Sequence, residues 1–113
     1  MSSQLNPIVG ETHVVEVAPG DVPELVEVDY GIVLEFQNLS KEFPYFEIQF
    51  DGPGPPNRIK PLTGRLGQPI FVEMPDIEQT FSYCMEFKNN DGTCKREVLR
   101  FARSCPGCPG NTG

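Results

Sequence analysis

The sequence predicts an all-β chain that folds as a single Greek-key β-sandwich of about seven short strands. Apolar and polar residues alternate in short runs, and turn-forming residues separate these runs every 8–12 residues or so, which is typical of antiparallel sandwiches. The 11 glycines and 12 prolines fall between the apolar runs. No segment carries a convincing helical period. A chain of 113 residues has the usual size of one domain.

The first half of the chain predicts four strands, at residues 12–17, 25–30, 32–39 and 45–50. Pro19 and Gly20 form a turn signal between the first two. The clearest alternation is in the last of the four, where Phe46, Ile48 and Phe50 share one face and the glutamate and glutamine between them share the other. This strand therefore has one face in the core and one in water.

The second half predicts four more segments, at residues 58–63, 69–74, 80–88 and 94–103. The Pro-rich run 51–57 is a long loop, because prolines there remove backbone donors. Pro61 restricts the segment 58–63 to a short edge strand. Residues 89–93, Asn-Asn-Asp-Gly-Thr, are a hairpin signal that joins the last two strands.

A five-residue hairpin loop fixes a register for these two strands. The expected cross-strand pairs are Phe81 with Phe101, Tyr83 with Leu99, Cys84 with Val98, Glu86 with Arg96 and Lys88 with Cys94. Leu99 and Phe101 then face the core. Cys84 and Cys94 are offset by four residues, or roughly 13 Å at the rise of a strand, too far for a disulfide. We expect both to behave as small packing residues.

Cys105-Pro106-Gly107-Cys108 has the most specific chemistry in the chain, since Pro-Gly favours a tight turn that brings both sulfurs to one side. Cys94 lies 11 residues before Cys105, roughly 35 Å along one strand, so the four cysteines do not form one zinc site. Three interpretations remain open for Cys105 and Cys108. They form an inert turn, a zinc site completed by other ligands such as a second chain, or a disulfide or redox couple.

The net charge of −7 argues against nucleic-acid binding, which needs a basic stripe. No apolar stretch is long enough to span a membrane, and the given chain has no signal peptide, so we expect a cytoplasmic protein. His13 is the only histidine and no nucleophile motif lies near it, so we expect no catalytic residues and no enzyme activity. The expected organisation is a flexible arm at 1–11, the sandwich at 12–104 and a tail with both CPGC cysteines at 105–113.

The remaining candidates are partner-binding residues, namely Phe43, Tyr45, Pro53, Pro55 and Pro56. Phe43 and Tyr45 are the aromatic residues expected at the surface, and the prolines belong to the long loop. These observations favour a small acidic protein-binding or assembly module, with a protein partner or a second copy bound. The alternative is a small metal-binding or thiol-redox protein that uses Cys105 and Cys108.

At Phe81-Ser82-Tyr83-Cys84 the chain resembles cupredoxin-like domains, whose penultimate strand carries an aromatic-x-aromatic-x-Cys run. The resemblance extends to the turn Ala18–Asp21 and to the run Val33–Asn38. It implies a Greek-key sandwich, with an immunoglobulin-like arrangement as the other option. The copper site of that family needs a histidine at position 87, which is Phe here, and another near 43–46, so we expect no copper.

Overall fold

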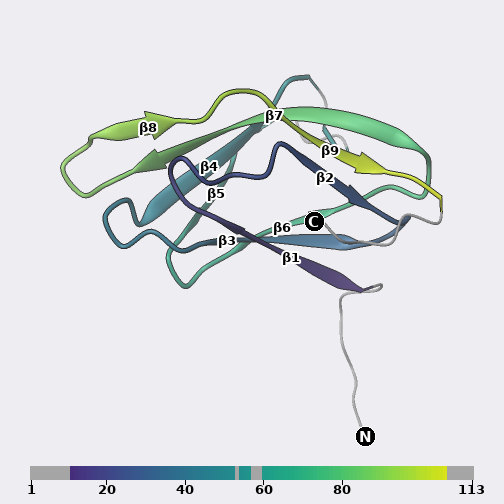
Figure 1. The fold of residues 1–113 in the computed structure, drawn as a ribbon, viewed down its shortest axis with the longest axis horizontal. Helices are drawn as coiled ribbons and strands as arrows, with labels where there is room; N and C mark the ends of the chain where they lie inside the picture. Colours follow the sequence, from purple (N-terminus) through teal and green to yellow (C-terminus); the bar gives the residue numbers. More distant parts are fainter. Residues whose placement is uncertain (1–10, 53, 57–59, 107–113) are drawn as a thin grey trace, which may run out of the picture.

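The computed structural model describes residues 11–52, 54–56 and 60–106, and these form a two-layered all-β fold (Figure 1). The smaller sheet has the order β1-β3-β6, and the larger has the order β2-β9-β7-β4-β5 with β8 paired to β7. The strands are β1 (Thr12–Val17), β2 (Leu25–Val28), β3 (Val33–Asn38), β4 (Tyr45–Phe50), β5 (Leu62–Arg65), β6 (Ile70–Glu73), β7 (Gln79–Lys88), β8 (Cys94–Arg96) and β9 (Arg100–Ser104). The predicted β-sandwich is confirmed, with nine strands in the described residues.

The connections cross between the two layers. The chain passes from β3 in the small sheet to β4 in the large sheet, then from β6 in the small sheet to β7 in the large sheet. Within the layers, β3 pairs antiparallel with β6, and β4 pairs antiparallel with β7. Strand β1 pairs in parallel with β3, and strand β2 pairs in parallel with β9. Both β1 and β2 are edge strands, and they belong to different sheets. These crossings connect the two layers of the sandwich.

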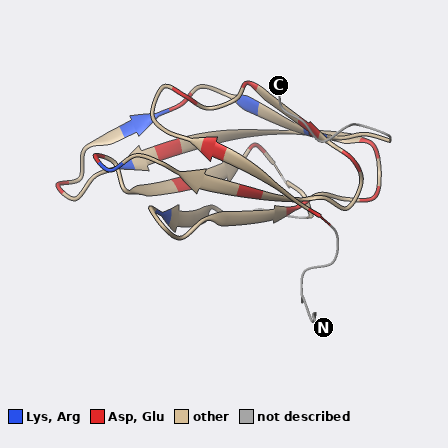
Figure 2. Cartoon of the chain, turned by 60° about the horizontal axis from the view of Figure 1, so that its bottom comes forward, with Lys and Arg blue, Asp and Glu red and all other residues tan. Residues whose placement is uncertain are grey.

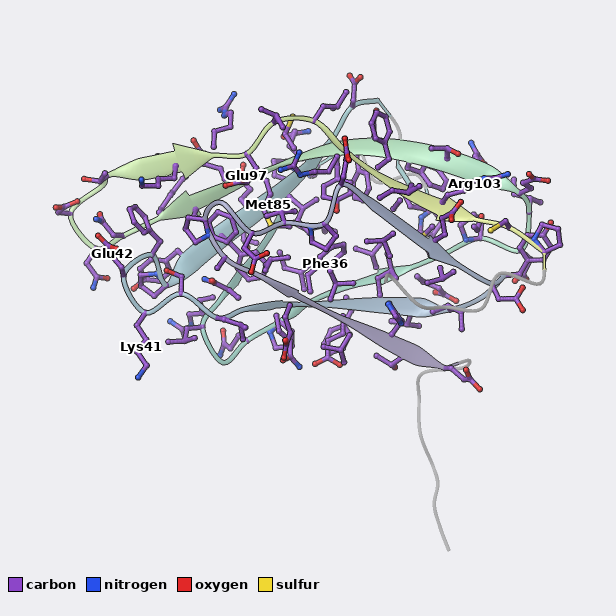
Figure 3. The ribbon with its side chains drawn as sticks, in the orientation of Figure 1. Phe36, Lys41, Glu42, Met85, Glu97 and Arg103 are labelled. Carbon is purple, nitrogen blue, oxygen red and sulfur yellow. The ribbon has the colours of Figure 1, made fainter. Side chains whose placement is uncertain are left out.

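The core lies between the layers and consists of the alternate apolar residues of both sheets. Figure 3 shows Phe36 and Met85 directed into this space from β3 and β7. The fully buried side chains include Tyr83, Phe36, Phe46, Phe87, Leu34, Ile48 and Met85. Phe36 and Tyr83 meet edge to face across the layers, with ring centroids 5.8 Å apart. The inward face expected for β4 is therefore confirmed.

The pairing of the last strands differs from the expected register by one residue. Glu86 pairs with Arg96 and Lys88 with Cys94, as expected. Beyond them the chain leaves the ladder at residues 97–99, and β9 pairs Phe81 with Ala102 and Tyr83 with Arg100. The expectation of one strand over 94–103, with Phe81 opposite Phe101 and Tyr83 opposite Leu99, is wrong.

A β-bulge explains the shift. Two residues of β7, Cys84 and Met85, lie between the two paired regions, whereas three residues, Glu97, Val98 and Leu99, lie between them on the other side. The Glu97 N–H still donates to the Met85 carbonyl at 2.7 Å, so the extra residue follows Glu97. One extra residue reverses which side chains face the core for the rest of the strand.

Candidate functional site

Cys105 follows β9 directly and is buried, with 4% of its surface exposed. Its backbone N–H donates to the Val28 carbonyl at 3.0 Å, which extends the β2–β9 pairing by one step. Cys105 takes part in a disulfide, while Cys84 and Cys94 are free. Cys108 lies outside the described residues. Since a sulfur in a disulfide offers no thiolate, the zinc hypothesis for this pair applies to the reduced protein.

The described part of the chain contains no group of three or more His, Cys, Asp or Glu residues placed to hold a metal ion. Among the same residues there is no helix of the length and apolarity needed to cross a membrane.

The predicted contact residues do not share one surface. Phe43 is corrected to a core residue with 4% exposure, because its N–H donates to Ser40 Oγ and its carbonyl accepts from Asn38 Nδ2, both at 2.9 Å. These two bonds fold the β3–β4 loop inward. Tyr45 remains exposed at 39%, as expected.

The loop prolines proposed for partner contact do not all lie at the surface. Pro55 is buried and Pro56 is exposed, while Pro53 lies outside the described residues. Gly54 is buried against the Phe50 ring, so closely that an added Cβ would lie 2.4 Å from a ring carbon. The loop therefore packs against Phe50 at this point.

The β-bulge gathers apolar side chains on the outer face of the large sheet. Leu25 of β2 lies directly opposite Phe101 of β9, and they are 43% and 37% exposed. The bulge residues Val98 and Leu99 are 67% and 42% exposed and lie just before β9. We call these four residues, Leu25, Val98, Leu99 and Phe101, the bulge patch. Exposed apolar residues that lie near one another mark contact surfaces more often than scattered ones do.

The inner side of the bulge is polar. Arg100 lies opposite the fully buried Tyr83, so both side chains are on the core side of the sheet. Glu97 and Arg100 form an ion pair at 3.5 Å with side chains only 11% and 17% exposed. A carboxylate oxygen of Glu97 also accepts from the Gly20 N–H at 2.7 Å, and Gly20 has a positive φ of 81° in the β1–β2 turn. Figure 3 labels Glu97 in this region. These contacts hold the bulge to the neighbouring turn.

Tyr83 carries the clearest pKa shift of this region. Burial raises the pKa of Tyr83 far above its usual value of 10.0, and the nearby Arg100 charge opposes this only in part. Neither the Tyr83 hydroxyl nor Arg100 Nε has a hydrogen-bond partner among the described residues. The bulge region therefore combines a mostly covered charged pair with a buried hydroxyl that has no partner among the described residues, while Leu99 and Phe101 are at the surface.

Sequence reasoning missed the bulge patch and assigned two of its residues to the core. The sequence does contain a sign of the bulge in the run Glu97-Val98-Leu99-Arg100, where two charged residues flank two apolar ones. Because side chains of a regular strand alternate between its faces, no regular strand buries both apolar residues and exposes both charges.

Tyr45 lies in a concave region of the large sheet, where β4 pairs with β5 and β7. It is directly opposite Arg65 on one side and Lys88 on the other. Together with neighbouring residues of β4 and β5 they line a shallow hollow of about 400 Å³. Lys88 Nζ lies 4.0 Å from a Glu47 carboxylate oxygen and 3.9 Å from one of Glu86, so its charge is already shared.

Comparison with known proteins found no matching family model, no matching curated protein and no matching solved structure.

Proposed function

We propose that this chain is a non-enzymatic protein-binding or assembly module, and that two copies associate through the bulge patch. One observation carries the proposal. The bulge and β9 expose Leu99 and Phe101, respectively, although the unbulged register would place both in the core. Complete burial of a Leu or Phe side chain is worth about 1.5–3 kcal/mol. About two fifths of each side chain remains exposed, so the fold forgoes a corresponding part of this energy, and a partner that covers the patch recovers it.

The charges around the bulge patch favour a second copy as the partner. Glu24 is exposed directly before Leu25 on the β2 side. Arg96 precedes the bulge on the β8 side, and its side chain is 72% exposed. A two-fold axis that runs across the line from Glu24 to Arg96 brings the acidic side of one copy toward the basic side of the other, since in an isologous contact residue i meets j and j meets i. The apolar centre with a charged rim is the usual composition of a specific interface.

Sedimentation equilibrium of the purified protein over a concentration series tests this proposal. We expect a monomer–dimer equilibrium that Phe101→Ser and Leu99→Ser shift at least tenfold toward monomer, a loss of about 1.4 kcal/mol of association free energy. Phe71→Ser is the matched control, because Phe71 is 45% exposed on the other sheet and should leave the equilibrium unchanged. Arg96→Glu should weaken the dimer, and adding Glu24→Arg to it should restore the dimer.

Two results would refute association through the patch. One is a protein that remains monomeric up to about 1 mM, a concentration at which even a contact of about −4 kcal/mol is half formed. The other is a dimer that Phe71→Ser weakens as much as Phe101→Ser does.

The second candidate function is thiol-redox or metal chemistry at Cys105 and Cys108, and the disulfide at Cys105 is the observation that favours it. We propose the cytoplasm as the compartment, where thiols are kept reduced and such a disulfide opens. Thiol titration and elemental analysis of untagged protein, with Cys105→Ser and Cys108→Ser as controls, test it. A bound ion or a reversible two-thiol transition that both variants abolish supports this function, and the absence of both eliminates it.

The cupredoxin-like relationship remains a proposal of fold ancestry alone. Its support is the position of the Phe81-Ser82-Tyr83-Cys84 run, on a central strand with Phe81 and Tyr83 facing the core. Phe87 occupies the place of a copper-binding histidine and is fully buried among apolar residues, so we propose no copper.

A further inference from the structure

The outer face of the small sheet carries a regular row of apolar and acidic residues. Val14 of β1 lies opposite Glu35 of β3, and Glu35 lies opposite Phe71 of β6. Val14 and Phe71 are each 45% exposed, so the carboxylate lies between two accessible apolar side chains. This face is on the opposite layer from the bulge patch (Figure 1).

The charge of this face has a single sign. Strands β1, β3 and β6 contain Glu16, Glu35 and Glu73 and no lysine or arginine. Figure 2 shows acidic segments without basic ones along the strands of this sheet. Together with the net charge of −7, this arrangement produces a negative potential over the sheet that attracts cations and repels another acidic surface. Two copies of this face do not pack on each other for the same reason.

A groove continues the face at the C-terminal end of β3. It has a volume of about 360 Å³, and Leu39, Leu66 and Pro69 form its apolar wall. Leu39 and Leu66 are 52% and 41% exposed, so the groove is open to a partner. Its volume is that of a small ligand pocket and accommodates an aliphatic side chain.

Glu35 belongs to both the sheet face and the groove. It lines the groove together with Gln37, and Gln37 Nε2 donates to its carboxylate at 2.6 Å. This hydrogen bond holds the carboxylate at the groove mouth. Arg65 is the one cation in the lining, and its Nε donates to Gln68 Oε1 at 2.9 Å. The site therefore combines an apolar hollow with a fixed acidic group beside it.

We propose that this face and groove bind a cationic segment of a partner protein, with one aliphatic side chain in the groove and lysine or arginine beside Glu35 and Glu73. The sign of the charge selects the partner, because an acidic segment or a nucleic acid is repelled. Since this site and the bulge patch lie on different sheets, a dimer formed through the bulge patch presents two such sites on its outer surfaces. The inference does not depend on that dimer.

Nuclear magnetic resonance titration of the ¹⁵N-labelled full chain with the capped peptide Lys-Lys-Leu-Lys-Lys tests the proposal. The titration is run at about 0.01 M ionic strength, where exposed charges are least screened. We expect the amide shifts to be confined to β1, β3, β6 and residues 66–69. The peptide Lys-Lys-Ser-Lys-Lys should bind at least fivefold more weakly, because it lacks the side chain for the groove.

Two charge-neutralising variants make the test specific. Glu35→Gln should weaken peptide binding about fivefold to tenfold, in the range of a charge-assisted contact. Glu47→Gln removes a charge from the middle of β4, on the other sheet, and should change binding less than twofold. Leu39→Ser should reduce the preference for the leucine peptide and leave the affinity for the serine peptide unchanged.

Four outcomes would overturn the proposal. They are no shifts at low ionic strength, equal binding of the leucine and serine peptides, equal effects of the two glutamate variants, and shifts centred on the large sheet. If the signals of this face move with protein concentration in the absence of peptide, the face is a contact between copies and the proposal is wrong. None of these outcomes depends on the sedimentation result for the bulge patch.

Discussion

Lysine substitutions at two adjacent residues of β9 measure directly which side chains face the core. Ala102 is 2% exposed and lies opposite Phe81 in the sandwich interior, whereas its neighbour Phe101 is 37% exposed on the outer face. The regular hairpin register, without a bulge, exchanges these positions, so that Phe101 faces the core and Ala102 faces outward. The pair Ala102→Lys and Phe101→Lys therefore distinguishes the two registers by the sign of a stability difference.

The magnitudes follow from burial. An ammonium group at position 102 lies among apolar side chains, and its desolvation costs several kcal/mol, against a total stability of about 5–15 kcal/mol for a domain. We expect Ala102→Lys to be largely or wholly unfolded. About three fifths of the Phe101 surface is covered, so its loss removes about 1–2 kcal/mol of the 1.5–3 kcal/mol for a fully buried Phe. A lysine there extends its ammonium into water.

Urea denaturation followed by far-ultraviolet circular dichroism, on dilute monomeric protein, gives both free energies of unfolding. Phe71→Lys calibrates the cost of the same change at an exposed position of the other sheet. If Phe101→Lys is destabilised more than Ala102→Lys, the bulge is absent in solution, and the proposed assembly surface is lost with it.

Four other expectations concern Tyr83, Gly64 and Asp91. Tyr83→Phe should raise the free energy of unfolding by about 1 kcal/mol, since the hydroxyl is buried without a partner among the described residues. Because the pKa of Tyr83 is raised in the native protein, the Tyr83 hydroxyl loses its proton at a lower pH in the unfolded chain than in the folded one. The free energy of unfolding should therefore fall above pH 10.0 by up to about 1.4 kcal/mol per pH unit, which alkaline unfolding curves measure. Gly64→Ala should cost about 1–3 kcal/mol in urea melts, because its Cβ would lie 2.8 Å from the Gln68 carbonyl oxygen, and an undiminished stability would contradict this geometry. Hydrogen bonds from the Thr93 hydroxyl and N–H hold the pKa of Asp91 below its usual value, so the Asp91–Thr93 contact should weaken as pH falls through that lowered pKa. Thr93→Ala should raise the pKa of Asp91, as measured from the pH dependence of its carboxyl resonance.

The candidate sites show the limits of local reasoning more clearly than the fold does. Tyr45 was correctly expected at the surface, but Phe43, two residues earlier, is held inside by hydrogen bonds from its loop to Ser40 and Asn38. These bonds depend on where the loop folds back, which alternation within a strand does not report. The row of Val14, Glu35 and Phe71 joins three strands from distant parts of the chain, so no single segment of sequence contains it.

The sequence by itself determined the all-β class, the inward face of β4, and the pairing of Glu86 with Arg96, because period-two alternation and hairpin length are local properties. It also placed Cys105 at the exit of the last strand. Only the tertiary structure decided the register of β9. A parallel pairing with β2, and the bonds of Glu97 to Gly20 and Arg100, stabilise a bulge that local patterning opposes. One extra residue at that bulge moves Leu99 and Phe101 from the expected core to the surface, because successive side chains of a strand point to opposite faces.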